Sequence, residues 1–224
     1  MKAVQATMSR PGGALLLFAR EPVIGQVKTR LVPEIGPDRA LSLYRVLLEQ
    51  QIALVNAQQG VARQCWIDGD LEHADFRSFE GSRHSQVEGD LGRRMGAAMD
   101  DALLNHDFAV LIGCDCPQLD TTYLESAFKV LEEGADAVFG PAADGGYVLI
   151  GLRQSEPGLF REIDWGTGRV MAQTRSKLAR QGLQWQELST VSDIDTPADL
   201  ALLGPSIMKR WVQLDAQSRP SEPE

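Results

Sequence analysis

The stretch FAVLIGCDCPQL, from Phe108 to Leu119, places a short apolar run directly before a polar turn that contains Asp115. An apolar run of this length is typical of a buried strand. Other runs of the same kind alternate along the chain with longer segments of helical period. This alternation predicts an α/β fold in which helices cover a mostly parallel central sheet.

The predicted elements follow from apolar periodicity and from turn residues. We expect strands over 14–19, 62–67, 108–113, 135–139, 147–152 and 183–188. We expect helical segments over 37–57, 71–79 and 122–133, and helix starts in the segment 86–95 and at Asp195. One domain is expected over 14–214, with flexible ends at 1–13 and 215–224.

The composition excludes several classes of protein. At 224 residues and 43% hydrophobic content the chain can bury the core of one domain. A formal net charge of −9 opposes a nucleic-acid partner, because such proteins carry a basic face. The longest apolar run of the first fifty residues, Ala14 to Ala19, is too short for a membrane span or a signal peptide. The cysteine count of 3 is odd, which suits a reducing compartment. We therefore expect a soluble, cytoplasmic protein with no membrane partner.

Charged residues gather in the loops predicted to follow the strands, where open parallel sheets bind ligands. The basic residues are Arg20, Lys28, Arg30, Arg93 and Arg94, and the acidic ones are Asp115, Asp144, Asp193 and Asp195. Neighbouring carboxylates repel unless a cation holds them, and Mg²⁺ or Mn²⁺ accepts one or two carboxylates together with phosphate oxygens. The pattern predicts a pocket for a metal and a nucleotide.

Six motifs in the same order resemble a known family. They are FAREPVIGQVKTRL, EGDLGRRM, IGCDCPQL, GPAADGGYVLIGL, WGTGRV and SDIDTPADL, and together they span residues 14 to about 203. The chain resembles bacterial nucleotide-diphospho-sugar transferases of the arsenosugar biosynthesis glycosyltransferase type. This family has the GT-A-like, Rossmann-like α/β/α sandwich, which it shares with 2-phospholactate guanylyltransferase and molybdenum cofactor guanylyltransferase. The resemblance implies the same three-layer fold here.

The resemblance also implies roles for individual residues. Asp115 matches the metal-binding aspartate of a DxD motif, although Cys116 replaces its second carboxylate. Asp195 matches a later metal contact. The segment with Gln86, Gly89 and Gly92 matches the one that contacts base and ribose. Lys28 and Arg30, in the loop after the first strand, match a phosphate-binding region, although the glycine-rich GGxSxRMG loop of many nucleotidyltransferases is missing. Arg20 in the same loop and Arg94 beside the glycines are further candidate phosphate ligands.

The sequence around Asp144 predicts the acceptor side of the pocket. Gly145 and Gly146 would let a substrate approach the backbone closely, Tyr147 and Trp165 are further candidates for substrate contact, and Asp144 is the candidate general base. Structural alternatives remain for each of these residues. Asp144 alone can close an Asx turn, and Trp165 can cover the core. Likewise Asp115 can end a strand, and Asp193 and Asp195 can cap a helix.

Three functions are consistent with these residues. The first is a metal-dependent glycosyltransferase that moves a sugar from a nucleotide sugar to a small-molecule acceptor. The second is a nucleotidyltransferase of the guanylyltransferase type that releases pyrophosphate from a nucleoside triphosphate, and the third is a non-catalytic module that binds a nucleotide sugar. Cys114 and Cys116 form a C-x-C around Asp115, but no histidine lies at ligand spacing, so we expect packed thiols.

Overall fold

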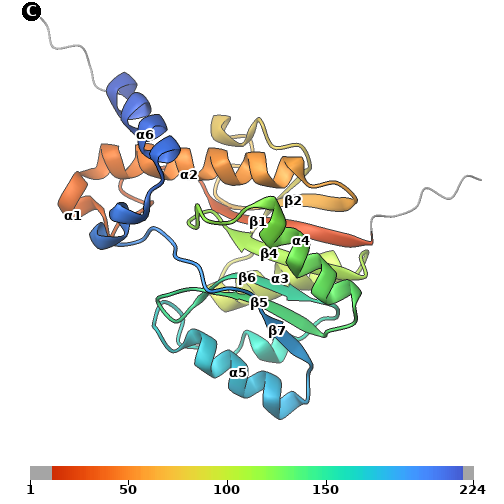
Figure 1. Ribbon diagram of the computed structural model, residues 1–224. Helices are drawn as coiled ribbons and strands as arrows, with labels where there is room; N and C mark the ends of the chain where they lie inside the picture. The colour runs from red at the N-terminus through yellow and green to blue at the C-terminus, as the bar shows by residue number, and fades with distance from the viewer. Residues whose placement is uncertain (1–11, 219–224) are drawn as a thin grey trace, which may run out of the picture.

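The computed structural model describes residues 12–218 and shows a seven-stranded sheet with helices on both faces (Figure 1). The strand order is β3-β2-β1-β4-β6-β5-β7. Strand β6 pairs antiparallel with β4 and β5, and the other pairs are parallel. The expected α/β sandwich with a mostly parallel sheet is confirmed. Residues 1–11 and 219–224, which hold most of the predicted flexible ends, lie outside the described residues.

The bounds of most predicted elements agree with the apolar runs of the sequence. The strands are β1 Gly13–Arg20, β2 Val61–Asp68, β3 Ser82–Ser85, β4 Phe108–Gly113, β5 Ala137–Pro141, β6 Tyr147–Leu152 and β7 Trp185–Glu187. The α-helices are α1 Val32–Ile35, α2 Pro37–Ala57, α3 Leu91–Leu103, α4 Thr121–Glu132, α5 Val170–Gln181 and α6 Pro205–Ser218, and the 3₁₀ helices are η1 Ala74–Phe76, η2 Pro157–Leu159 and η3 Pro197–Leu202. The sequence patterns do not predict β3, α5 and α6.

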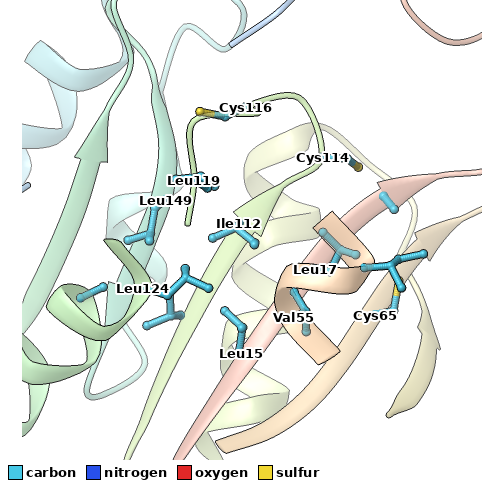
Figure 2. Close-up of a cluster of buried hydrophobic side chains, with 14 of the residues drawn as sticks. Leu15, Leu17, Val55, Cys65, Ile112, Cys114, Cys116, Leu119, Leu124 and Leu149 are labelled. Carbon is cyan, nitrogen blue, oxygen red and sulfur yellow. The ribbon is translucent and has the colours of Figure 1, made fainter. Parts of the chain in front are cut away.

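Alternate residues of the central strands build two cores, one on each face of the sheet. Leu15 and Leu17 of β1 face the core covered by α2 and α4, where Val55 packs, as Figure 2 shows. Leu16, between them, faces the core covered by α3 and α5. Because both faces are buried, the strands read as continuous apolar runs. A third cluster packs α6 against α2, where the Trp211 indole donates a hydrogen bond to the Arg39 carbonyl.

Three predicted segments differ from the structure. Over 71–79 only the short helix η1 forms, because side chains of Asp70 and His73 accept hydrogen bonds from nearby backbone N–H groups and compete with a helix. The segment from Asp195 forms a 3₁₀ helix that begins after Thr196. Helix α6 continues to Ser218, although a flexible tail is expected from residue 215.

The carboxyl ends of β1, β2 and β4 meet at one edge of the sheet. Strand β6 runs in the opposite direction, so its first residues reach this same edge. This reversal places the loop between β5 and β6 beside the loops that follow the parallel strands. Among the described residues 12–218, none of the helices has the length and apolarity needed to cross a bilayer.

Candidate active site

One cavity of about 620 Å³ opens at this edge of the sheet. Its predicted site residues come from six segments that are far apart in the sequence. The predicted site residues that line it are Arg20, Lys28, Arg30, Gln86, Arg94, Asp115, Asp144, Gly146, Tyr147, Trp165 and Asp195. The topology therefore brings together most of the residues that the sequence singled out.

Four carboxylates form an acidic wall of this cavity: Asp115, Asp144, Asp193 and Asp195. Asp115 follows β4, and its carbonyl accepts a hydrogen bond of 2.9 Å from the N–H of Ile194. This backbone bond holds the loop after β4 against the segment that carries Asp193 and Asp195. Burial, and then the negative charge of Asp144, raise the pKa of Asp193, with smaller contributions from Asp115 and Asp195. The acidic side chains thus act on one another electrostatically.

Lys28 is buried next to this acidic wall and contacts Asp115 and Ile194. Its side chain is only 3% exposed, and its Nζ lies 2.5 Å from Asp115 Oδ1 and donates a 2.5 Å hydrogen bond to the carbonyl of Ile194. The backbone of Lys28 has φ 49°, a left-handed conformation that is uncommon for a residue with a side chain. The predicted phosphate ligand is therefore held by the protein itself, in a conformation typical of functional sites.

Arg30 pairs with Asp195 at the mouth of the cavity. The distance from Arg30 Nη1 to Asp195 Oδ2 is 2.6 Å, and the two side chains are 59% and 37% exposed. Exposed pairs of this kind contribute little to stability and can exchange partners. Asp195 caps no helix, because Thr196 takes that position and hydrogen-bonds to Asp199. The alternative in which Asp195 serves only as a cap is therefore wrong.

A second charged group lies at the ends of β1 and β2. Asp68 Oδ2 accepts hydrogen bonds from Arg20 Nε at 3.1 Å and from Arg94 Nη1 at 2.8 Å. Gln86 donates from its amide to the carbonyls of Ala19 and Trp66, and its own carbonyl accepts from Arg94. Gln86 was predicted to contact the base; here its polar atoms tie two strand ends together and position Arg94. The neighbouring Arg93 is exposed and does not line the cavity.

The DGG sequence forms the turn between β5 and β6. Asp144 Oδ1 accepts a 2.8 Å hydrogen bond from the N–H of Gly146, so the predicted Asx turn is present. The carboxylate of Asp144 nevertheless lines the cavity beside the other acids. The structural role and the proposed catalytic role of Asp144 are therefore compatible.

Tyr147 and Trp165 form the wall next to this turn. Their rings meet edge to face with centroids 6.2 Å apart, and Tyr147 packs in the same way on Phe139 at 5.4 Å. Burial raises the pKa of the Tyr147 phenol, so this side chain stays neutral. The pair offers an aromatic surface to a substrate while it also covers the core.

Three predicted glycines, Gly89, Gly92 and Gly145, do not line the cavity. A Cβ on Gly92 would collide with Trp165 and with the carbonyl of Phe160, so close helix packing requires this glycine. Gly89 has φ 128°. Gly145 has φ 91°, and a Cβ there would collide with the backbone of Gly168. These glycines shape the walls, and the expectation that they contact the ligand directly is not supported by their positions.

The cysteines pack as the sequence predicts. Figure 2 shows Cys114 and Cys116 at the end of β4, and both are buried. The Cys114 thiol donates to the carbonyl of Phe18, and the Cys116 thiol to that of Ser192. Burial raises the pKa of Cys114 to about 12 and that of Cys116 to about 11. Both therefore stay protonated and are poor nucleophiles or metal ligands.

The oxygen atoms of the acidic wall fit a hard divalent cation. Asp115 Oδ1 is buried and accepts no hydrogen bond of good geometry from the described residues; the Lys28 ammonium is its close neighbour. Within residues 12–218, no three His, Cys, Asp or Glu side chains are gathered closely enough to hold a metal ion by themselves. Mg²⁺ or Mn²⁺ typically takes one or two carboxylates and completes its shell with substrate phosphates and water.

Sequence reasoning gave no site role to Asp68 and left Asp193 without one. Like the predicted site residues, both lie at or just after the end of a strand or bridge. Asp68 is the last residue of the second strand, and Asp193 lies two residues after an isolated bridge between Val191 and Ala142. Asp68 directly follows the predicted strand over 62–67, so the position after a strand already pointed to it. The sequence grouped Asp193 with the other loop carboxylates, and the structure adds that it is buried beside Asp144.

Known proteins share this fold. A family model described as "Uncharacterized protein conserved in bacteria (DUF2064)" matches residues 51–167. The chain is 29% identical over 187 residues to a phosphoenolpyruvate guanylyltransferase of Sphaerobacter thermophilus, an alignment that covers 79% of this chain and 86% of that protein. A solved structure of a candidate nucleotide-diphospho-sugar transferase from Desulfovibrio desulfuricans G20 superposes with a TM-score of 0.81 at 29% identity, over 94% of this chain and 99% of that one.

A more distant likeness concerns the fold alone. Rv0371c of Mycobacterium tuberculosis H37Rv, solved in complex with manganese, superposes with a TM-score of 0.50 at 17% identity over 86% of this chain and 97% of that one. Together these similarities confirm a nucleotidyl- or nucleotide-sugar-transferase type of fold. The guanylyltransferase relative favours the predicted nucleotidyltransferase alternative over sugar transfer. The narrower resemblance to arsenosugar enzymes stays a prediction.

Proposed function

The chain belongs to the DUF2064 family of proteins conserved in bacteria, and we propose that it is a metal-assisted nucleotidyltransferase. It would transfer a nucleoside monophosphate group from a nucleoside triphosphate to a small acceptor and release pyrophosphate. The observation that carries this proposal is a cavity that is lined both by the acidic wall and by the basic side chains of Arg20, Arg30 and Arg94. A cation between carboxylates and phosphates, with guanidinium groups around the phosphates, is the arrangement that phosphoryl transfer requires.

The acidic wall supplies the residues for the metal. Asp115 and Asp195 would hold Mg²⁺ or Mn²⁺, and substrate phosphates and water would complete the shell. When bound, the ion would neutralise charge on the phosphates and on the leaving pyrophosphate. The manganese complex of Rv0371c, a protein with the same type of fold, makes Mn²⁺ the first ion to test.

The arginines supply the phosphate contacts. Arg30 is free to leave its exposed pair with Asp195 when the carboxylate turns to a cation. Arg20 and Arg94 are held in place by Asp68, so their remaining N–H groups are fixed before a nucleotide arrives. Guanidinium groups suit phosphate oxygens because their donors are planar and paired.

The transfer itself is a displacement at the α-phosphorus. An acceptor oxygen forms a bond to the α-phosphorus, the bond from phosphorus to the bridging oxygen breaks, and pyrophosphate leaves with that electron pair. A hydroxyl acceptor must also lose a proton, which the Asp144 carboxylate would take. An acceptor that is already an anion needs no base. The name of the Sphaerobacter relative makes phosphoenolpyruvate the first acceptor to assay.

Sugar transfer from a nucleoside diphosphate sugar is the second candidate. The observation that favours it is the likeness, at TM-score 0.81, to the candidate nucleotide-diphospho-sugar transferase. The same cavity would hold the diphosphate, and the wall of Tyr147 and Trp165 would contact the sugar. The two candidates differ in their products, because nucleotidyl transfer releases pyrophosphate and sugar transfer releases a nucleoside diphosphate.

The test is a product assay with Mn²⁺ or Mg²⁺. The protein is incubated with each of the four nucleoside triphosphates and phosphoenolpyruvate, and in parallel with nucleotide sugars and hydroxyl acceptors; pyrophosphate, nucleoside diphosphates and adducts are measured. We expect pyrophosphate and a nucleotidylated acceptor, and their loss in Asp115→Asn. Glu125→Gln, which removes one carboxylate charge on the exposed face of α4, is the matched control and should stay active. Nucleoside diphosphate as the product would refute the proposal in favour of sugar transfer.

A further inference from the structure

Lys28 contacts two loops of the acidic wall at once. Its ammonium reaches Asp115 Oδ1 on one side and the Ile194 carbonyl on the other, each at 2.5 Å. Ile194 is the residue between Asp193 and Asp195, and its N–H already bonds to the Asp115 carbonyl at 2.9 Å. Lys28 and this backbone bond therefore close a ring that fixes the loop after β4 against the segment with the two later aspartates.

The position of Lys28 is rigid. Val27 and Leu31 on either side of it are 4% and 0% exposed, and the Lys28 carbonyl accepts a 2.9 Å hydrogen bond from the Leu31 N–H. The backbone of Lys28 is left-handed, and its side chain is 3% exposed. The ammonium donates a hydrogen bond to the Ile194 carbonyl and lies in an ion pair against Asp115, so little of it remains for a substrate.

We infer that Lys28 is a positioning residue, whose ammonium sets the geometry of Asp115 and of the Asp193–Asp195 segment for a divalent cation instead of binding nucleotide phosphate. The inference rests on the proposed function, since it concerns the cation of the same site. It replaces the sequence-based expectation that Lys28 holds a phosphate. Mutation of residues that orient metal ligands typically lowers metal affinity by about 10–100-fold.

The direction in which cation affinity changes when Lys28 is removed tests the positioning role, and nucleotide binding without metal tests the phosphate-binding role. By Coulomb's law alone, removing a positive charge beside a cation site should strengthen cation binding. Loss of a positioning contact should weaken it, by about 10-fold or more. A phosphate ligand, in contrast, should affect nucleotide binding even when no metal is present.

The experiment compares Lys28→Met with wild type and with Lys129→Met, a control that removes an exposed ammonium on α4. Mn²⁺ alone is titrated by electron paramagnetic resonance, and nucleoside triphosphate binding is measured in EDTA. We expect Lys28→Met to weaken Mn²⁺ binding about 10-fold or more and to leave metal-free nucleotide binding unchanged, while Lys129→Met matches wild type in both. Unchanged or tighter Mn²⁺ binding in Lys28→Met would overturn the positioning role of Lys28 but not the proposed metal site. Absence of Mn²⁺ binding in the wild-type protein would overturn both.

A measurement on the wild-type protein tests the inference without a variant, should Lys28→Met fail to fold. A crystal structure with Mn²⁺ and a non-hydrolysable nucleoside triphosphate analogue is expected to show Nζ still between Asp115 and the Ile194 carbonyl. An ammonium that has moved onto a phosphate oxygen would refute the positioning role.

Discussion

Replacing Gly145 by alanine tests why the turn next to Asp144 contains glycine. Gly145 has φ 91°, and an added Cβ would collide with the carbonyl group of Gly168. The left-handed backbone costs an alanine about 1–2 kcal/mol, and overpacking against backbone that cannot move away costs about 1–3 kcal/mol. We expect Gly145→Ala to lower the free energy of unfolding by the sum, about 2–5 kcal/mol.

Gly166→Ala is the matched control for this change. Gly166 also has a positive φ, 76°, but nothing lies within 4 Å of the position of its Cβ. This variant should lose only the backbone contribution, about 1–2 kcal/mol. The steric contribution of about 1–3 kcal/mol then corresponds to a difference in Tm of about 2–12 °C between the two variants of a domain of this size.

The assay is urea denaturation without any ligand, with the slope m compared to confirm that both variants unfold as wild type does. The carbonyl of Gly145 also accepts a 2.9 Å hydrogen bond from the N–H of Met171, so the collision should disturb the start of α5. Equal losses in the two variants would refute the steric argument. A Gly145→Ala protein that is as stable as wild type but binds nucleotide poorly would restore the expectation that this glycine contacts the ligand.

Two further predictions concern titratable groups. Because the folded pKa of Asp193 is raised by burial and by Asp144, ionising it costs stability as the pH rises from the ordinary aspartate value through the raised one. Asp193→Asn should therefore have the higher Tm at pH 8 and lose this advantage near pH 3; a lower Tm at pH 8 would contradict the raised pKa. Buried thiols should not react with Ellman's reagent in the native protein at pH 8 and should react in urea; rapid native labelling of Cys114 or Cys116 would show that the loop after β4 opens.

Much of the fold could be predicted because its signals are local. Strands β4 and β6 and helix α2 have the bounds that the sequence predicts. Each is specified by neighbouring residues: the two strands by continuous apolar runs, and the helix by Pro37 in its first turn and by its apolar stripe. The helix expected over 71–79 was wrong for an equally local reason, since hydrogen bonds of polar side chains to the backbone are invisible to apolar periodicity.

The sequence by itself determined the α/β class and the set of loops in which charged side chains gather, because strands, helices and strand ends are encoded by short patterns. Only the tertiary structure decided the partners within the site. Lys28 meets Ile194 across 166 positions of the chain, and Arg30 meets Asp195 across 165. The reversal of β6 and the burial of Asp193 beside Asp144 likewise arise from packing. Such contacts depend on the order in which all the strands assemble into the sheet, which no local pattern of residues specifies.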